Sequence, residues 1–90
     1  MSEMTFSDNL QDALDNLEKA RKSLRKTSRI SSIDIENMRT LLVQTNLAKK
    51  DMIAIMAIQG KVALVAEQFA MTNGRVYQLK TEYLKGQDEK

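Results

Sequence analysis

The side chains that could do chemistry in this chain are carboxylates, amines and hydroxyls, because histidine and cysteine are both absent. Without histidine, the chain lacks the side chain that most often serves as a general base or metal ligand near neutral pH. Without cysteine, disulfides, thiolate metal sites and cysteine nucleophiles are excluded. No spacing gathers the remaining groups around a tuned base, as an active site requires. We therefore expect a non-enzymatic protein with no catalytic residue, cofactor, metal site or small-molecule substrate.

One cluster of basic residues could bind a charged ligand. Its six members lie within eleven consecutive positions: Lys19, Arg21, Lys22, Arg25, Lys26 and Arg29. Such charges could contact nucleic-acid phosphates. However, acidic residues lie nearby, no aromatic residue is interleaved, and the net charge is only +2. The cluster is thus more typical of a solvated helix end whose cations face the negative end of the helix dipole. Nucleic-acid binding is kept as an alternative hypothesis.

The composition indicates a single all-α domain. The 90 residues include no proline, three glycines and 4% aromatic residues, so turn signals and strand formers are scarce. Residues that favour helices are abundant instead. A domain this small buries little of its surface, so a partner or a second copy would stabilise it.

The first helix is predicted to cover about residues 7–27. Thr5 and Ser7 are candidate caps, and Asp8 is suitably acidic for the first turn. Apolar side chains alternate between spacings of four and three, which is typical of a helix that packs along another helix. This stripe comprises Phe6, Leu10, Ala13, Leu17, Ala20 and Leu24, and Leu14 widens it. The serine-rich segment 27–32 favours a turn, because hydroxyl side chains compete with helical hydrogen bonds.

The second helix is predicted to run from about residue 33 to about residue 84. Ser31 or Ser32 would cap it, with Asp34 and Glu36 in the first turn. A glycine inside it, Gly60, would cost about 1 kcal/mol. The pair at 73–74, Asn-Gly, is a stronger stop signal, because both residues accept the left-handed conformation that ends helices. Residues 86–90 are predicted to be a frayed tail.

The short connection predicts an antiparallel helical hairpin. At 1.5 Å per residue, the second helix would be about 75 Å long and the first about 30 Å long. The predicted hairpin core comprises Phe6, Leu10, Leu14, Leu17, Leu24, Ile35, Met38 and Leu42. Residues beyond about position 55 would overhang and bind a helical protein partner or a second copy. These predicted partner-binding residues are Ile55, Met56, Ile58, Val62, Val65, Phe69, Asn73, Val76, Leu79 and Tyr83. The alternative is a break near Gly60 or Asn73-Gly74 that folds the end back as a third helix.

Residues 52–58 form a run of seven apolar side chains. A helix that is apolar on all sides is buried on several sides. The run therefore predicts the centre of a multi-helix core or homodimer, or else a groove for a different partner. A membrane helix over 52–71 is disfavoured, because Lys61 alone would cost about 3 kcal/mol at the centre of a span. Residues 1–8 lack the pattern of a signal peptide, so we expect a cytoplasmic protein whose export would need no cleaved signal.

The chain resembles the small helical-hairpin proteins of type VII secretion. These are the Trp-Xaa-Gly family and, more closely, the small helical partners of LXG-domain toxins, which carry a Phe-x-x-x-Asp motif near the end of the long helix. Here Phe69-Ala-Met-Thr-Asn73 follows Val65-Ala66, with asparagine in place of the acid. The Trp-Xaa-Gly turn is replaced by Arg29-Ile-Ser-Ser32. The resemblance implies an adaptor or chaperone that pairs with a toxin's helical domain and helps to present it for export.

A second resemblance concerns residues 34–66, which are similar to the long helix of type III secretion needle and inner-rod subunits. Those proteins usually carry proline in the turn and end soon after the long helix, whereas this chain has no proline and extends further. This resemblance implies a self-assembling structural subunit. The sequence thus predicts a helical interaction protein, with this subunit as the alternative.

Overall fold

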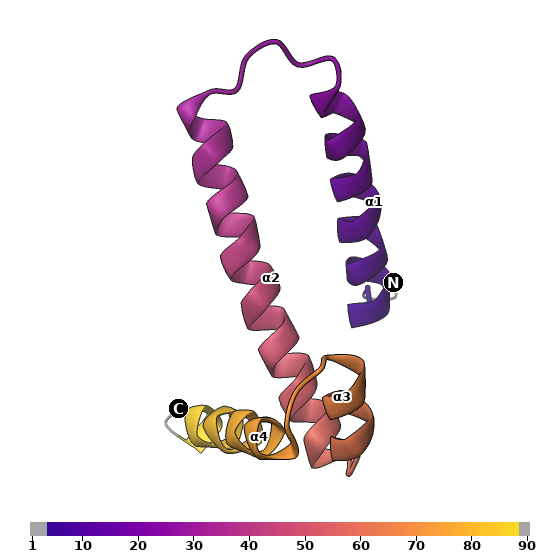
Figure 1. Cartoon of the computed structure of the whole chain (residues 1–90), viewed down its shortest axis with the longest axis vertical. Helices are drawn as coiled ribbons and strands as arrows, with labels where there is room; N and C mark the ends of the chain where they lie inside the picture. Colours follow the sequence, from indigo (N-terminus) through magenta and orange to yellow (C-terminus); the bar gives the residue numbers. More distant parts are fainter. Residues whose placement is uncertain (1–3, 89–90) are drawn as a thin grey trace. The chain divides into compact units, whose positions relative to one another are not determined.

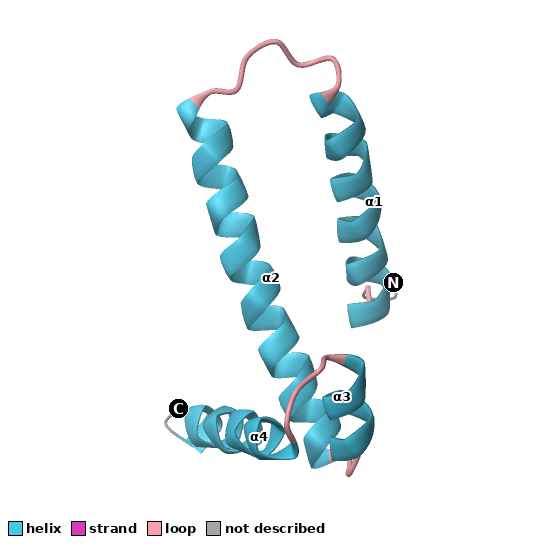
Figure 2. Ribbon diagram, in the orientation of Figure 1, coloured by secondary structure: helices cyan, strands magenta, loops and turns pink. Residues whose placement is uncertain are grey.

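A computed structural model describes residues 4–88 of the chain. The described residues form four α-helices and no strand, which confirms the all-α prediction (Figures 1 and 2). The helices are α1 (Phe6–Leu24), α2 (Ser32–Ile58), α3 (Val62–Gln68) and α4 (Asn73–Asp88). The chain divides into an N-terminal unit, Met1–Ile35, and a C-terminal unit, Glu36–Lys90. Each unit is held by its own local interactions, and these are taken in turn.

Helix α1 begins at a capping box formed by Thr5 and Asp8. The Asp8 amide donates to the Thr5 hydroxyl at 3.1 Å, and the Thr5 amide donates to the Asp8 carboxylate at 3.3 Å. These bonds satisfy amides that have no partner within the helix. The helix spans Phe6–Leu24 and carries Arg21 and Lys22 in its last turn, close to the predicted bounds.

The second capping box joins Ser31 and Asp34 at the start of α2. The Ser31 amide and the Ser31 hydroxyl each donate to the Asp34 carboxylate at 3.0 Å. In return, the Asp34 amide lies 3.3 Å from the Ser31 hydroxyl oxygen. The hydrogen bond from the Ser31 amide, followed by the one from its hydroxyl, lowers the pKa of Asp34 below its ordinary value of 3.8. Ser31 is therefore the cap, as one of the two predicted alternatives proposed.

This lowered pKa predicts a pH dependence at the start of α2. A carboxyl whose pKa is lower in the folded state stabilises folding above the unfolded value, and this contribution is lost as pH falls through the folded pKa. We therefore expect acidification below about pH 3.8 to destabilise the wild-type chain more than Asp34→Asn. Thermal unfolding followed by circular dichroism across this range checks the difference. Asp12→Asn, at an exposed acid in the middle of α1, is the control. Equal acid sensitivity of Asp34→Asn and the wild type would contradict the assignment.

Helix α2 ends at Ile58 and is followed by Gly60, whose φ is +81°. The Gly60 amide donates to the Ala57 carbonyl and the Lys61 amide donates to the Met56 carbonyl, both at 3.0 Å. This pair of bonds is the Schellman arrangement, which caps the final carbonyls of a helix and requires a left-handed residue. The continuous helix predicted over 33–84 is thus wrong, and the predicted alternative of a break near Gly60 is confirmed.

Helix α3 ends at Gln68 and is capped in the same way by Ala70, which has φ of +52°. The Ala70 amide donates to the Glu67 carbonyl at 3.3 Å, and the Met71 amide donates to the Ala66 carbonyl at 2.8 Å. Asn73-Gly74, predicted as a stop, instead opens α4. Thr72 caps that helix, since its hydroxyl accepts the Arg75 amide at 3.1 Å. The second break therefore lies just before the predicted Asn73-Gly74, and its left-handed residue is Ala70.

Substitutions at the two left-handed positions should change the free energy of unfolding in opposite directions. Gly60→Ala should destabilise the chain by about 1–2 kcal/mol, because an added Cβ meets no neighbour but disfavours this φ. Ala70→Gly should stabilise it by about 0.5–1 kcal/mol, because glycine removes the same penalty. Urea unfolding measures both changes. Gly86→Ala, within α4, is the control and should not destabilise. Changes of the same sign at Gly60 and Ala70 would contradict the two caps.

The C-terminal unit closes around one apolar cluster. Helices α3 and α4 pack against each other and against the last turns of α2 (Figure 1). The buried members of the cluster are Ile53, Ala57, Val65, Ala66, Val76 and Leu79. Three of them, one from each helix, are completely buried: Ile53, Val65 and Val76. The fold-back at the two caps is what brings these residues together, although the sequence separates Ile53 from Val76 by two helix ends.

The tail differs from its prediction within the described residues. Helix α4 continues through Asp88, so Gly86 belongs to a helix where a frayed tail was expected. Residues 89–90 lie outside the described residues.

Candidate interaction surfaces

The predicted partner-binding residues fall into two groups. Val65, Val76 and Leu79 are buried in the C-terminal cluster, and Met56 and Val62 pack against it. The expectation that these residues lack an apolar partner within the chain is corrected, because the fold-back supplies one. The remaining members keep more exposure: Ile55, Ile58, Phe69 and Asn73 are exposed, and Tyr83 is half-buried. They do not form one continuous stripe, since they are distributed over α2, the segment that follows α3, and α4.

The break at 69–72 also separates the two ends of the Phe-x-x-x-Asn motif. Phe69 follows the last residue of α3, and Asn73 is the first residue of α4. Both are exposed. Their four-residue spacing would place them one turn apart on a continuous helix, but they lie on either side of a left-handed residue here.

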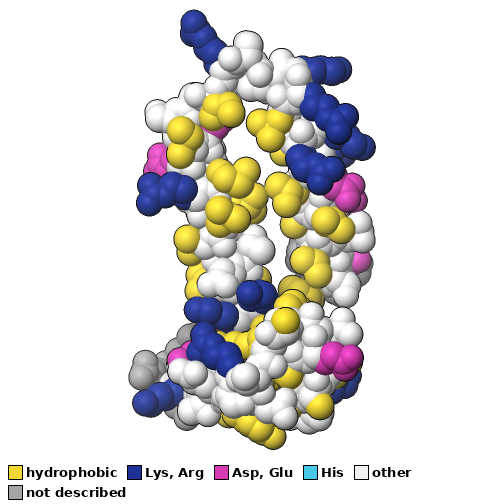
Figure 3. All heavy atoms as spheres, viewed as in Figure 1, with side chains coloured by type: hydrophobic (Ala, Val, Ile, Leu, Met, Phe, Trp, Pro, Cys, Tyr) yellow, Lys and Arg dark blue, Asp and Glu magenta, His cyan; other side chains and the backbone are white. Residues whose placement is uncertain are grey.

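The N-terminal unit has no buried residue among those described. The stripe of α1 is between 44% and 57% exposed at Phe6, Leu10, Leu14, Leu17 and Leu24. The other predicted hairpin-core residues are also exposed: Ile35, Met38 and Leu42. The buried residues among those described lie instead around Ile53, where the end of α2 packs with α3 and α4. Figure 3 shows apolar side chains at the surface along α1 and along the first half of α2.

The first half of α2 carries apolar residues on two separate faces. At about 100° per residue, Ile35, Met38 and Leu42 gather on one side of the helix. A second group lies well away from them around the helix axis: Ile33, Val43 and Leu47, here called the second face. Every member of both groups is exposed. A helix that packs on a single neighbour needs only one apolar stripe, so two faces indicate two neighbours.

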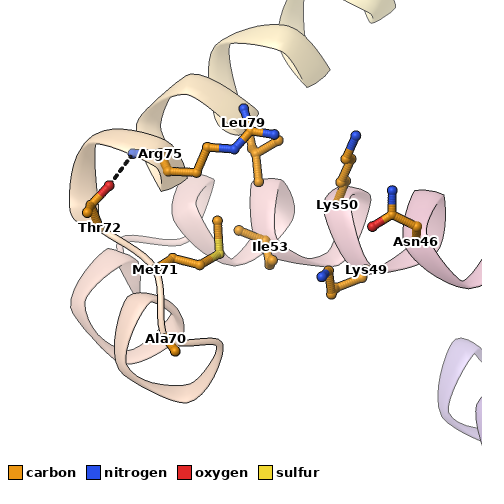
Figure 4. A pocket seen from close by; sticks show the side chains of 9 residues that line it. All are labelled: Asn46, Lys49, Lys50, Ile53, Ala70, Met71, Thr72, Arg75 and Leu79. Carbon is orange, nitrogen blue, oxygen red and sulfur yellow. Dashed lines mark hydrogen bonds between the residues drawn. The ribbon is translucent and has the colours of Figure 1, made fainter.

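A hollow lies between α2 and α4 and is lined mainly by residues of these helices and of the loop before α4. Lys49 and Lys50 come from α2 and Arg75 from α4, and no acidic residue lines it. Figure 4 shows Arg75 reaching over the hollow from the start of α4, with Lys50 rising from α2. Sequence reasoning missed this site, because only the fold-back brings Arg75 near two lysines that are distant in sequence.

The basic cluster of α1 is solvent-exposed throughout. Arg21 and Lys22 occupy the last turn of the helix, where cations face the negative end of the dipole. Lys26 and Arg29 follow in the connecting segment. This placement fits the interpretation of the cluster as a solvated helix end.

Comparisons with protein-family models, curated proteins and solved structures find no significant match. Within residues 4–88, no helix combines the length and apolar character that crossing a membrane would require. The same residues contain no group of three or more histidine, cysteine, aspartate or glutamate side chains placed to hold a metal ion.

Proposed function

We propose that this chain is a non-enzymatic helical interaction protein, which pairs with the helices of another protein. The observation that carries the proposal is the pair of exposed apolar faces on the first half of α2. Burying exposed aliphatic side chains is worth about 1.5–3 kcal/mol for each residue, so such surfaces favour association. We therefore propose that the pairing surface lies on the first half of α2, and no longer on the residues beyond position 55 that the sequence analysis assigned to an overhang.

One of the two faces is proposed to be used within the chain. The face formed by Ile35, Met38 and Leu42 has the same alternating spacing as the stripe of α1. The seven-residue connection formed by residues 25–31 suits two antiparallel helices. Pairing these surfaces forms the proposed hairpin and covers the apolar side of α1.

The second face, Ile33, Val43 and Leu47, is proposed to bind the partner. A single short helix such as α1 covers one side of α2 and leaves this face for another helix. The type VII resemblance supplies the class of partner: the helical domain of a secreted toxin, which the chain would accompany as an adaptor or chaperone. Binding of a second copy of this chain is the alternative, and it corresponds to the self-assembling subunit implied by the type III resemblance.

The test combines Val43→Gln with Leu47→Gln on the second face. Light scattering after size exclusion would measure the mass of the chain alone and mixed with the helical domain of an LXG-domain toxin. We expect a complex whose affinity falls roughly 10- to 100-fold in the double variant, because both side chains are only about half exposed and burying the rest of each contributes about 0.8–1.5 kcal/mol. The control combines Ile30→Gln and Leu84→Gln, which change equally exposed apolar residues away from α2.

The outcomes separate the alternatives. A complex that the control variant preserves and the second-face variant weakens supports the proposal. Concentration-dependent growth of the chain alone, abolished by the same double variant, favours self-assembly. A chain that stays monomeric and forms no complex with such a domain would contradict a partner-binding role for the second face.

A further inference from the structure

The hollow between α2 and α4 combines positive charge with an apolar floor. Its volume is about 430 Å³. Three cations surround it: Lys49 is exposed, whereas Lys50 and Arg75 are half-buried. The partial burial of Lys50 and Arg75 means that both side chains pack in part against the protein surface around the hollow. No acidic side chain among the lining residues neutralises them.

The floor of the hollow consists of side chains from the C-terminal core. Ile53 is fully buried and Leu79 nearly so, while Met71 is half-buried and retains some exposure. In Figure 4, Ile53 lies between Met71 and Lys49, and Arg75 passes above Met71 and Ile53. Methionine adapts its shape to different apolar ligands. An apolar group of a ligand could therefore rest on Met71 while a negative group meets the surrounding cations.

We propose that this hollow binds an acidic segment of a protein partner, in which a carboxylate side chain stands next to an aliphatic one. The carboxylates would lie among Lys49, Lys50 and Arg75, and the aliphatic side chain would cover the floor. Arg75 can hold a carboxylate with two parallel hydrogen bonds, and the amide of Asn46 provides a further donor at the edge. The site goes beyond the proposed function, because it shares no residue with the second face.

The lining favours an acidic peptide over a nucleic acid. No aromatic side chain lines the hollow, so bases would have no platform for stacking. A phosphodiester backbone would also leave the apolar floor uncovered, whereas a peptide supplies charge and aliphatic surface together. Three cations suit a few carboxylates at one place, in contrast to the extended basic track that follows a nucleic-acid strand.

Fluorescence anisotropy at low salt would test the proposal with the full-length chain. The probe is a short labelled peptide of alternating glutamate and leucine pairs, and the comparison peptide has lysine at every glutamate. The test variant combines Lys49→Gln, Lys50→Gln and Arg75→Gln. The control combines Lys22→Gln, Lys26→Gln and Arg29→Gln, so both variants lose the same charge. Lys49→Glu alone, at an exposed position, serves as a second test variant that leaves the core untouched.

We expect the acidic peptide to bind and the lysine peptide not to bind. Loss of three partly screened ion pairs should weaken binding of the acidic peptide roughly tenfold or more in the test variant. The control should bind like the wild type, and Lys49→Glu should bind more weakly. Equal loss in both triple variants would show nonspecific charge attraction and overturn the proposal. Binding of polyuridylate RNA that depends on the same three residues, without binding of the acidic peptide, would assign the hollow to nucleic acid instead.

Discussion

Replacing Ile53 with alanine should destabilise the C-terminal unit by about 2–4 kcal/mol. Ile53 is completely buried where α2 meets the two helices that follow it. Truncation would remove apolar contacts and leave a cavity that three short elements cannot easily fill. Because the whole cluster contains only six buried residues, this loss would be a large part of the stability of the unit. Urea unfolding followed by circular dichroism measures the change.

Ile55→Ala provides the matched control for this experiment. It makes the same substitution two residues further along α2, at a position that is 40% exposed. We expect it to cost less than about 1 kcal/mol, because most of the cavity and transfer cost requires burial. In a single continuous helix the cluster would not exist, and the two substitutions would have similar effects. Equal destabilisation by Ile53→Ala and Ile55→Ala would therefore argue against the fold-back.

Replacing Leu10 and Leu17 together with glutamine should unfold α1 and leave the C-terminal unit intact. A helix of 19 residues is marginal in water by itself, so α1 depends on the pairing proposed for its apolar stripe. If both leucines are buried by that pairing, their loss costs about 2 kcal/mol each. Hydrogen exchange of backbone amides would then accelerate throughout Phe6–Leu24, while amides near Val65 and Val76 would keep their protection.

Lys19→Gln is the control for the stripe, since Lys19 lies on the side of α1 opposite Leu17. It introduces the same side chain and should leave exchange in α1 unchanged. Slow exchange of α1 in the double leucine variant would remove the support for a hairpin. Equal acceleration by Lys19→Gln would indicate that intrinsic helix stability alone, without any pairing, governs this segment.

Local signals in the sequence were sufficient for the class of fold and for the starts of α1 and α2. Thr5 and Ser31 were among the candidate caps, with Asp8 and Asp34 expected in the first turns, and each pair forms reciprocal hydrogen bonds in the structure. Gly60 was one of the two positions at which the alternative prediction placed a break, because glycine is a poor helix former. These features depend on neighbours in the chain and need no knowledge of tertiary packing.

The second break could not be predicted from local preference. Alanine is the strongest helix former, so a left-handed Ala70 contradicts its propensity. The conformation is maintained because Met71 and Ala66 pack on the C-terminal cluster once the chain has turned. The stop predicted at Asn73-Gly74 lies close to the observed break. However, these two residues begin α4, and Thr72 caps it. The conformation at Ala70 thus depends on tertiary contacts, which a sequence pattern does not reveal.

The same limitation explains why residues that were predicted to bind a partner are buried in the C-terminal cluster. Val65, Val76 and Leu79 have helical spacing whether the helix continues or folds back, so periodicity alone assigned them to an overhanging stripe. The spacing of Leu10 and Leu17 likewise indicates a face that packs, without showing what covers it. The hollow lined by Arg75 could not be predicted from the sequence. Its three cations come together only because the chain turns back at the ends of α2 and α3.

The fold-back of the C-terminal unit is tested most directly by nuclear Overhauser effects between methyl groups of Ile53 and Val76. In a continuous helix these residues would lie about 35 Å apart, at 1.5 Å per residue, and no cross-peak would appear. Since both belong to one buried cluster, we expect cross-peaks from the Ile53 methyl groups to Val76 and to Val65 in a sample labelled at isoleucine and valine methyl groups. Assigned spectra of the monomeric chain with no such cross-peaks would contradict the fold-back, and with it the placement of the interaction surfaces on α1 and the first half of α2.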